Sequence, residues 1–168
     1  MDSFEEIYTL YWNDVYKFIL RLTEYDRWLA EEITQETFYR AFVGFSKFRG
    51  ERKKKTWIIG IGRNVFYKYV RSERKRRVFE KGLSEDGQTY ADPAADAETV
   101  EKCRIVRKII EKMSEPAKTV VEYRLFGGMS YSEIASALKI REGTAKVIFS
   151  RAKVKIINEM KEVYGYEV

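Results

Sequence analysis

Apolar residues recur three or four positions apart along almost the whole chain, which is the spacing of amphipathic α-helices. Near the amino end these positions are Ile7, Leu10, Tyr11, Val15, Phe18, Ile19 and Leu22. Ser3 followed by Glu6 is a capping-box pattern and should start this first helix. A second helix is predicted over residues 28–45, with an apolar face made of Ile33, Thr37, Phe38, Ala41 and Phe42. No strand-like alternation stands out, so the pattern predicts an all-α fold.

A third helix is predicted from about residue 56 to about residue 76, after a break at residues 48–50 and a basic loop. Val65 and Tyr69 are expected to face the core of this part of the chain. Gly60 and Gly62 lower the stability of an isolated helix and therefore indicate close packing at this point.

The pattern changes over residues 80–100, which are acidic and poor in large apolar side chains. Such a segment cannot bury enough apolar surface to form a core, so we expect an extended, flexible linker. The linker divides the chain into an N-terminal helical domain, residues 1–79, and a C-terminal domain, residues 101–168.

Helical spacing returns in the C-terminal domain, where four shorter helices are predicted. They cover residues 100–113, 116–126, 130–138 and about 142–162, and Ser130 with Glu133 repeats the capping-box pattern. Cys103 lies on the apolar face of the first of them and is expected to be a small buried side chain rather than a reactive thiol.

Charge is distributed in blocks and adds a functional interpretation. Residues 1–45 carry a net charge of −5, residues 46–77 carry +11, residues 78–101 carry −6, and residues 102–168 carry +6. Cations as dense as those of residues 46–77 repel one another unless an anion binds, although charged residues often only solvate a helix face. The blocks predict different partners for different segments.

Several classes of protein are excluded by composition. The chain has no histidine and one cysteine, which rules out the usual zinc sites and His-dependent catalytic triads and predicts no metal and no cofactor. A lone cysteine fits a reducing compartment. No run approaches the roughly 20 apolar residues of a membrane span, and the acidic amino end does not resemble a signal peptide. We therefore expect a cytoplasmic protein.

Residues 130–162 form the most specific motif: a capped helix, a short turn and a basic helix, which is typical of a helix-turn-helix. Ile134, Ala135, Leu138, Ile140 and Ala145 are spaced to pack its two helices together. The second helix can present Lys146, Ser150, Arg151 and Lys153 to duplex DNA. The alternative is a plain helical hairpin with a solvated basic face.

The predicted third helix mixes aromatic side chains with cations, a combination suited to single-stranded nucleic acid. These residues are Trp57, Arg63, Asn64, Phe66, Tyr67, Lys68, Tyr69, Arg71, Arg74, Lys75, Arg76 and Arg77. The predicted second helix instead carries Glu31, Glu32, Gln35 and Glu36. Carboxylates repel nucleic acid, so this acidic surface should meet a basic protein, unless it is simply hydrated.

Taken together these motifs resemble the sigma-70 family of transcription initiation factors, in particular its extracytoplasmic-function (ECF) group, over most of the chain outside the linker. AEEITQETFYRAF, residues 30–42, is similar to the helix that binds the clamp coiled coil of the largest polymerase subunit. The resemblance assigns polymerase contacts to Glu32, Gln35 and Glu36.

FRG at residues 48–50, TW at 56–57 and RN at 63–64 are similar to the part of the family that reads the −10 element and captures unpaired bases. The resemblance implies DNA contacts for Phe48, Arg49, Gly50, Lys53, Lys54, Trp57, Arg63, Asn64, Tyr67, Lys68, Arg71, Arg74 and Lys75. GMSYSEIASALKIREGTAKVIFSRAKVKI, residues 128–156, is similar to the reader of the −35 duplex. It implies contacts for Arg124, Lys146, Ser150, Arg151 and Lys153.

The resemblance also implies partners: core RNA polymerase, bound at its clamp coiled coil and its flap, promoter DNA, and an anti-sigma protein, which in many members is attached to the membrane. It implies no small-molecule substrate and no catalysis by the chain itself. Three positions depart from the family. Lys54 stands in a loop that usually carries an aromatic residue, and Val147 and Ile148 stand where polar or basic residues are common.

Two other classes of function remain open at this point. A polymerase-independent regulator would use the same helix-turn-helix but would give no role to the acidic helix. A nuclease would need carboxylates clustered for Mg²⁺ beside the basic surface, and residues 46–77 contain only Glu51 and Glu73.

Overall fold

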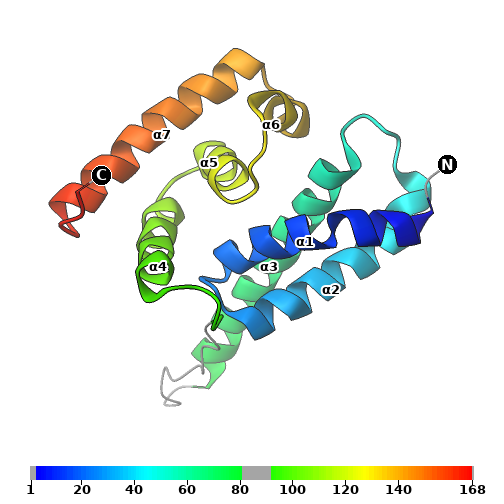
Figure 1. The fold of residues 1–168 in the computed structure, drawn as a ribbon, viewed down its shortest axis with the longest axis horizontal. Helices are drawn as coiled ribbons and strands as arrows, with labels where there is room; N and C mark the ends of the chain where they lie inside the picture. Colours follow the sequence, from blue (N-terminus) through cyan, green and yellow to red (C-terminus); the bar gives the residue numbers. More distant parts are fainter. Residues whose placement is uncertain (1–2, 81–91, 168) are drawn as a thin grey trace.

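A computed structural model describes residues 3–80 and 92–167, which form two packed bundles of α-helices (Figure 1). The first bundle contains α1 (Phe4–Leu22), α2 (Arg27–Gly44) and α3 (Lys54–Phe79), with a short 3-10 turn at Phe45–Lys47 after α2. The second contains α4 (Ala97–Glu111), α5 (Ala117–Leu125), α6 (Tyr131–Leu138) and α7 (Glu142–Glu162). The prediction of an all-α protein with two small helical domains is confirmed.

The core of the first bundle lies where the three helices face one another. Phe18 of α1, Phe38 of α2 and Ile58 of α3 are buried there. Three side chains predicted to lie on buried faces do not: Leu10 is 67% exposed, Phe42 61% and Tyr69 37%. Each helix of a three-helix bundle is covered only along the stripe that faces its two neighbours, so apolar positions at the margin of that stripe stay in solvent.

A side-chain cap explains the start of α1 but not that of α3. Ser3 and Glu6 form the predicted capping box at the start of α1. α3 begins at Lys54, two residues before its predicted start, and no side chain caps it. Lys54 and Lys55 therefore belong to the first turn of α3 and not to the preceding loop. The apolar spacing starts only with Trp57 and Ile58, which is why it located the start of the helix too late.

Gly62 makes the close packing of the three helices possible, as predicted. A Cβ atom at this position would lie 3.1 Å from Cδ1 of Ile19 on α1 and 3.3 Å from Oγ1 of Thr37 on α2. Both neighbours are fully buried. Arg63 and Asn64 follow Gly62 directly, so this contact positions their part of α3 relative to α1 and α2.

The second bundle begins earlier than predicted. The carboxylate of Asp96 accepts a hydrogen bond from the Thr99 amide at 2.8 Å and caps α4, so residues 97–100 of the predicted linker are helical. Most of the remaining predicted linker, residues 81–91, lies outside the described residues. The later helices agree with the sequence: Ser130 caps α6, and α7 has the predicted bounds.

The two bundles touch through apolar and polar contacts. The rings of Phe18 on α1 and Tyr123 on α5 lie 6.1 Å apart. Arg21 donates a hydrogen bond of 2.6 Å from Nη1 to the carbonyl of Phe126, and the thiol of Cys103 donates to the carbonyl of Arg21 at 3.3 Å. Cys103 is buried, as predicted. None of the helices in residues 3–80 and 92–167 is long and apolar enough to cross a membrane.

Candidate nucleic-acid interface

The loop after α2 and the exposed face of α3 enclose a hollow of about 440 Å³, which we call the −10 hollow. Phe48, Arg49, Trp57 and Asn64 line it together with Tyr123 of α5. The rings of Phe48 and Trp57 lie 4.7 Å apart. The hollow thus combines aromatic faces, an amide and a cation, the groups that hold an unstacked base and its phosphate. Four of the predicted −10 residues are brought together here.

A groove between α2 and α3 continues from this hollow. Trp57, Asn64, Lys68 and Arg71 line it on the α3 side, so two further predicted cations follow the same face. Arg74 and Lys75 lie farther along α3 and are exposed. A strand of nucleic acid leaving the −10 hollow would meet a row of cations along α3.

The acidic surface of α2 borders a neighbouring groove. Glu32, Gln35 and Glu36 line it, and Glu36 pairs with Arg40 of the same helix at 2.8 Å. That ion pair is exposed and adds little stability. Near these carboxylates Tyr39 and Val43 are exposed, which the helical spacing did not single out. Exposed apolar and acidic side chains on one helix face suit a protein partner.

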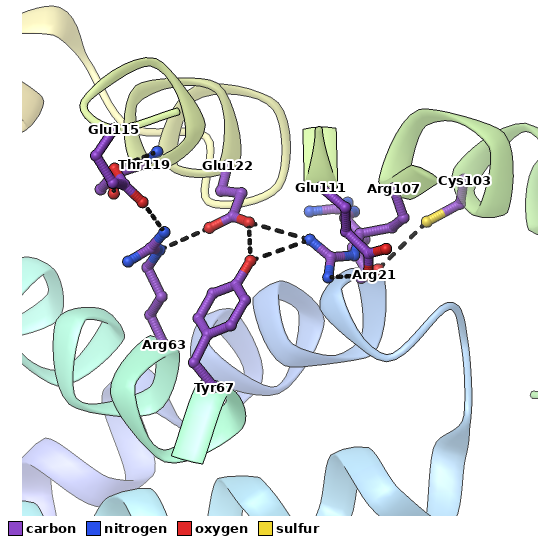
Figure 2. A network of polar contacts seen from close by, with 9 residues as sticks. All are labelled: Arg21, Arg63, Tyr67, Cys103, Arg107, Glu111, Glu115, Thr119 and Glu122. Atoms are coloured by element: carbon purple, nitrogen blue, oxygen red, sulfur yellow. Dashed lines mark hydrogen bonds and ion pairs between the residues drawn. The ribbon is translucent and has the colours of Figure 1, made fainter. Parts of the chain in front are cut away.

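Arg63 and Tyr67 depart from the predicted arrangement, because both face the second bundle (Figure 2). Neither residue lines the −10 hollow. Nε of Arg63 lies 2.6 Å from Oε2 of Glu122, and Nη2 lies 2.8 Å from Oε1 of Glu115. The hydroxyl of Tyr67 donates to Glu122, and Arg107 pairs with the same carboxylate at 3.0 Å. We call these five residues the interdomain network.

The interdomain network contains buried charges. Glu122 is completely buried and Arg107 is 2% exposed, so their charges are removed from water and depend on one another. Burial and the charge of Glu122 raise the pKa of Tyr67 to about 12, which keeps its hydroxyl a donor. Burial alone would raise the pKa of Glu115, but hydrogen bonds from Thr119 and the Arg63 guanidinium hold it below its ordinary value.

Two of the three remaining predicted −10 residues lie at the edge of the second bundle. Gly50 and Lys53 line a small cleft with residues of α6. Gly50 has φ +75°, which explains the glycine in this loop. Nζ of Lys53 lies 3.5 Å from Oε1 of Glu133, an exposed pair, and Ser136 lies at hydrogen-bond distance from the carbonyl of Glu51. Lys54 lies in the first turn of α3.

The predicted −35 residues follow the helix-turn-helix. Lys146, Ser150, Arg151 and Lys153 are exposed on α7. Lys139 in the turn has φ 56°, and Arg141 starts α7 without a side-chain cap. Arg124 is different: its guanidinium donates to the carbonyl of Met129 at 2.8 Å and lies 4.3 Å from the centre of the Tyr131 ring. In this structure it therefore supports the start of α6.

Glu122 and Arg107 are the buried residues of the interdomain network that the sequence analysis missed. Each interrupts an otherwise apolar helix face: Glu122 follows two fully buried valines, and Arg107 lies among buried residues of α4. A single charge within such a face is the available signal, because buried charges need partners. It does not say that the partners come from the other bundle.

Two protein families match separate parts of the chain. Residues 7–76 match the family described as Sigma-70 region 2, and residues 103–156 match the family described as Sigma-70, region 4. The ECF RNA polymerase sigma factor SigM of Bacillus subtilis is 29% identical over 157 residues, which cover 92% of this chain and 93% of SigM. The ECF RNA polymerase sigma-E factor of Haemophilus influenzae is 29% identical over 139 residues, covering 77% of this chain and 74% of that protein.

Solved structures share the fold. The sigma factor RpoE of Bartonella quintana, in complex with the anti-sigma factor NepR, superposes with a TM-score of 0.63 at 21% identity over 95% of this chain and 97% of RpoE. CnrH, in complex with the cytosolic domain of CnrY, gives the same TM-score at 17% identity, over 94% of this chain and 87% of CnrH. With both sigma regions matched in order, this chain belongs to the ECF group of the sigma-70 family of RNA polymerase sigma factors.

Proposed function

We propose that this sigma factor assigns its three tasks to three separate surfaces: α2 to core RNA polymerase, the −10 hollow with α3 to unpaired promoter bases, and α7 to the −35 duplex. The supporting observation is that the chain presents three exposed surfaces of different chemistry: an acidic one on α2, an aromatic and basic one at the −10 hollow and α3, and a basic one on α7. The first two lie in the part matched by sigma region 2 and the third in the part matched by region 4. The chain directs the polymerase and leaves the synthesis of RNA to it.

The α2 surface suits a basic protein. Glu32, Gln35 and Glu36 would repel DNA phosphates and attract cations, and the family resemblance implies the clamp coiled coil of the largest subunit as the partner. The neighbouring Tyr39 and Val43 add apolar area, which acidic side chains alone would not supply.

The −10 hollow suits a base taken out of the stack. Phe48 and Trp57 offer aromatic faces, and Asn64 offers both a donor and an acceptor to a base edge. Arg49 at the hollow and Lys68 and Arg71 along α3 would hold the strand by its phosphates. Binding energy gained by capturing unpaired bases would then favour strand opening.

The exposed face of α7 suits the major groove. Lys146 lies in the second turn of α7, close to the end at which a helix-turn-helix contacts bases, and Arg151 and Lys153 lie farther along, where cations meet phosphates. Exposed Val147 lies beside them and can make an apolar contact but donates no hydrogen bond. We therefore expect α7 to contribute more affinity than base discrimination at that position.

Reconstituted transcription tests the proposal. The purified chain should confer promoter-specific initiation on a bacterial core polymerase supplied with a pool of genomic promoters. Glu36→Arg should weaken core binding and leave duplex binding intact, whereas Arg151→Ala should do the reverse. Glu162→Arg makes the same charge reversal at the far end of α7 and should leave core binding unchanged.

No specific initiation with any core enzyme would overturn the proposal. Tight, specific duplex binding by the chain alone would then favour a regulator that acts without polymerase. Equal losses of core binding in Glu36→Arg and Glu162→Arg would show that net charge, and not the α2 surface, governs the interaction.

We also expect an anti-sigma partner for this chain. RpoE of Bartonella quintana, which shares its fold, is solved in complex with the anti-sigma factor NepR. Purification of the tagged chain from its native host would test this: an inhibitor that co-purifies and blocks reconstituted transcription supports it, and recovery of polymerase subunits alone contradicts it.

A further inference from the structure

We propose that Tyr131 is a positioning residue of the −35 surface, whose ring gathers Arg124 of α5 and Lys146 of α7 into one site for a phosphate of the duplex backbone. This inference deepens the proposed function, on which it rests, because it concerns how α7 and its neighbours hold duplex DNA. Arg124 and Lys146 are predicted −35 residues, whereas Tyr131 is not.

Side chains of three helices meet at the ring of Tyr131, which is the first residue of α6 and is half-buried. The guanidinium carbon of Arg124 lies 4.3 Å from the centre of this ring, and Nζ of Lys146 lies 6.0 Å from it. The negative face of an aromatic ring attracts cations out to about 6 Å, so Arg124 lies well inside this range and Lys146 at its edge. One side chain of α6 thus orders the charged ends of two long side chains from the preceding and following helices.

The ring that orders these cations is itself held in place. It lies 6.1 Å from the ring of Phe149 on α7, at an interplanar angle of 60°, and Phe149 is buried. Ser130, directly before Tyr131, fixes the start of α6 by accepting a hydrogen bond from the Glu133 amide at 3.1 Å. Tyr131 therefore has little freedom to follow the cations and acts as their fixed support.

Both cations keep donors for a ligand. A guanidinium carries five N–H groups, and Arg124 donates from Nη1 to the carbonyl of Met129 at 2.8 Å. Lys146 is exposed, and its carboxylate partner Glu142 lies 3.8 Å away in an exposed pair, which holds it only weakly. An anion that reaches the ring can accept hydrogen bonds from both side chains.

The charges around the ring favour such an anion. Arg124 and Lys146 lie close to one ring centre and are therefore within about one Debye length of each other, ~10 Å at 0.1 M salt, where like charges repel. In residues 3–80 and 92–167, Glu142 is the one carboxylate that pairs with either of them. A phosphate bound between the two would offset this repulsion and form charge-assisted hydrogen bonds.

The position of the site suits the DNA backbone. In a helix-turn-helix the first helix crosses the backbone, while the N-terminal end of the second enters the major groove. Tyr131 begins the first of these helices, and Lys146 lies in the second turn of α7. A phosphate held by Arg124 and Lys146 would fix both helices on the duplex, and such contacts set the register in which bases are read.

A ring of similar shape with a different charge distribution tests the inference. Fluorine withdraws electrons from an aromatic ring, so pentafluorophenylalanine fills much the same space as phenylalanine, but its face no longer attracts cations. The affinity of the full chain is measured by fluorescence anisotropy for a labelled duplex that the native chain recovers from a random pool. Tyr131→Phe keeps the ring face and should bind with an affinity close to the native one. Replacing Tyr131 by pentafluorophenylalanine should weaken binding about tenfold relative to Tyr131→Phe, because the DNA must then order both cations itself.

A double-mutant cycle shows whether the ring acts through the cations. In a chain that carries both Arg124→Gln and Lys146→Gln, phenylalanine and pentafluorophenylalanine at position 131 should give equal affinities, since no cation is left to position. Phe149→Leu is the matched control for packing, because it loosens the contact with the Tyr131 ring without changing that ring. It should bind the duplex as the native chain does.

Equal affinities of the phenylalanine and pentafluorophenylalanine variants in the otherwise native chain would overturn the inference. An undiminished loss in the chain without the two cations would also overturn it, as would an equal loss in Phe149→Leu, because the ring would then act by packing. If Arg124→Gln, Lys146→Gln and Arg151→Ala all bind the duplex as the native chain does, the −35 surface of the proposed function fails. Weaker binding in these three variants, with no effect of the fluorinated ring, refutes the role of Tyr131 alone.

Discussion

Gly62 of α3 packs closely against Ile19 of α1 and Thr37 of α2. Replacing it by alanine tests whether this contact leaves room for a side chain. The added Cβ would meet Cδ1 of Ile19 at 3.1 Å and Oγ1 of Thr37 at 3.3 Å. Ile19 is fully buried, and the Thr37 hydroxyl is held by the carbonyl of Ile33 at 2.6 Å, so neither can move away freely. Crowding in a packed core costs ~1–3 kcal/mol.

Gly60 provides the matched control on the same helix. A Cβ there would meet only the hydroxyl of Tyr123, at 3.4 Å, which is an ordinary contact. Alanine is favoured over glycine inside a helix by ~1 kcal/mol, and this gain is common to both substitutions. Gly60→Ala should therefore raise the free energy of unfolding by about 0.5–1 kcal/mol, and Gly62→Ala should be ~1–3 kcal/mol less stable than Gly60→Ala.

Urea unfolding followed by tryptophan fluorescence measures this difference. The three tryptophans, Trp12, Trp28 and Trp57, all belong to the first bundle, so fluorescence reports the unfolding of that bundle. If Gly62→Ala is as stable as Gly60→Ala, the contact with α1 and α2 is not limiting. The position of α3 on α1 and α2, and with it the position of Asn64, would then need another explanation.

Three further predictions concern the second bundle and the contact between the two. Burial raises the pKa of Cys103 to about 11 and that of Tyr67 to about 12. The stability that these two neutral groups contribute is therefore complete below about pH 9 and is lost as the pH rises through 11 to 12. In urea unfolding over this pH range, Cys103→Ala should lose less of its free energy of unfolding than the native chain does. If Arg151 holds one phosphate, Arg151→Ala should make the negative slope of log affinity against log salt shallower by ~0.9. An unchanged slope in duplex binding would refute that contact. Ser130→Ala removes the acceptor for the Glu133 amide at 3.1 Å and should lower the stability of the second bundle by ~1 kcal/mol, measured by circular dichroism; an unchanged midpoint would show that the cap is redundant.

Local signals in the sequence predicted the helices well. The capping residues Ser3 and Ser130 mark the starts of α1 and α6, and the bounds of α7 are those that the basic helical pattern predicts. The aromatic and polar residues at 48, 57 and 64 do line one hollow, because they lie on one face of α3 and on the loop before it. Short-range geometry is enough for such features.

The pairing of Arg63 with Glu122 could not be predicted in this way. The two residues are 59 positions apart, and their contact depends on how one bundle docks on the other. Helical spacing places Arg63 on a face of α3 but does not say whether DNA or protein covers that face. Likewise Leu10 and Phe42 have the spacing of core residues, and only the number of neighbouring helices leaves them exposed.

The carboxylates of Glu115, Glu122 and Glu133 lie against the most basic segment of the chain and bind Arg63 and Lys53. A genome offers 10⁶ or more non-specific sites to any protein with free cations, and such sites compete with the intended one. Each cation that the chain binds internally removes about one phosphate contact and reduces this competition. With Arg63 and Lys53 paired internally, the chain should therefore bind chromosomal DNA less tightly than its cation content suggests, which raises the fraction of the chain that is free to meet a polymerase.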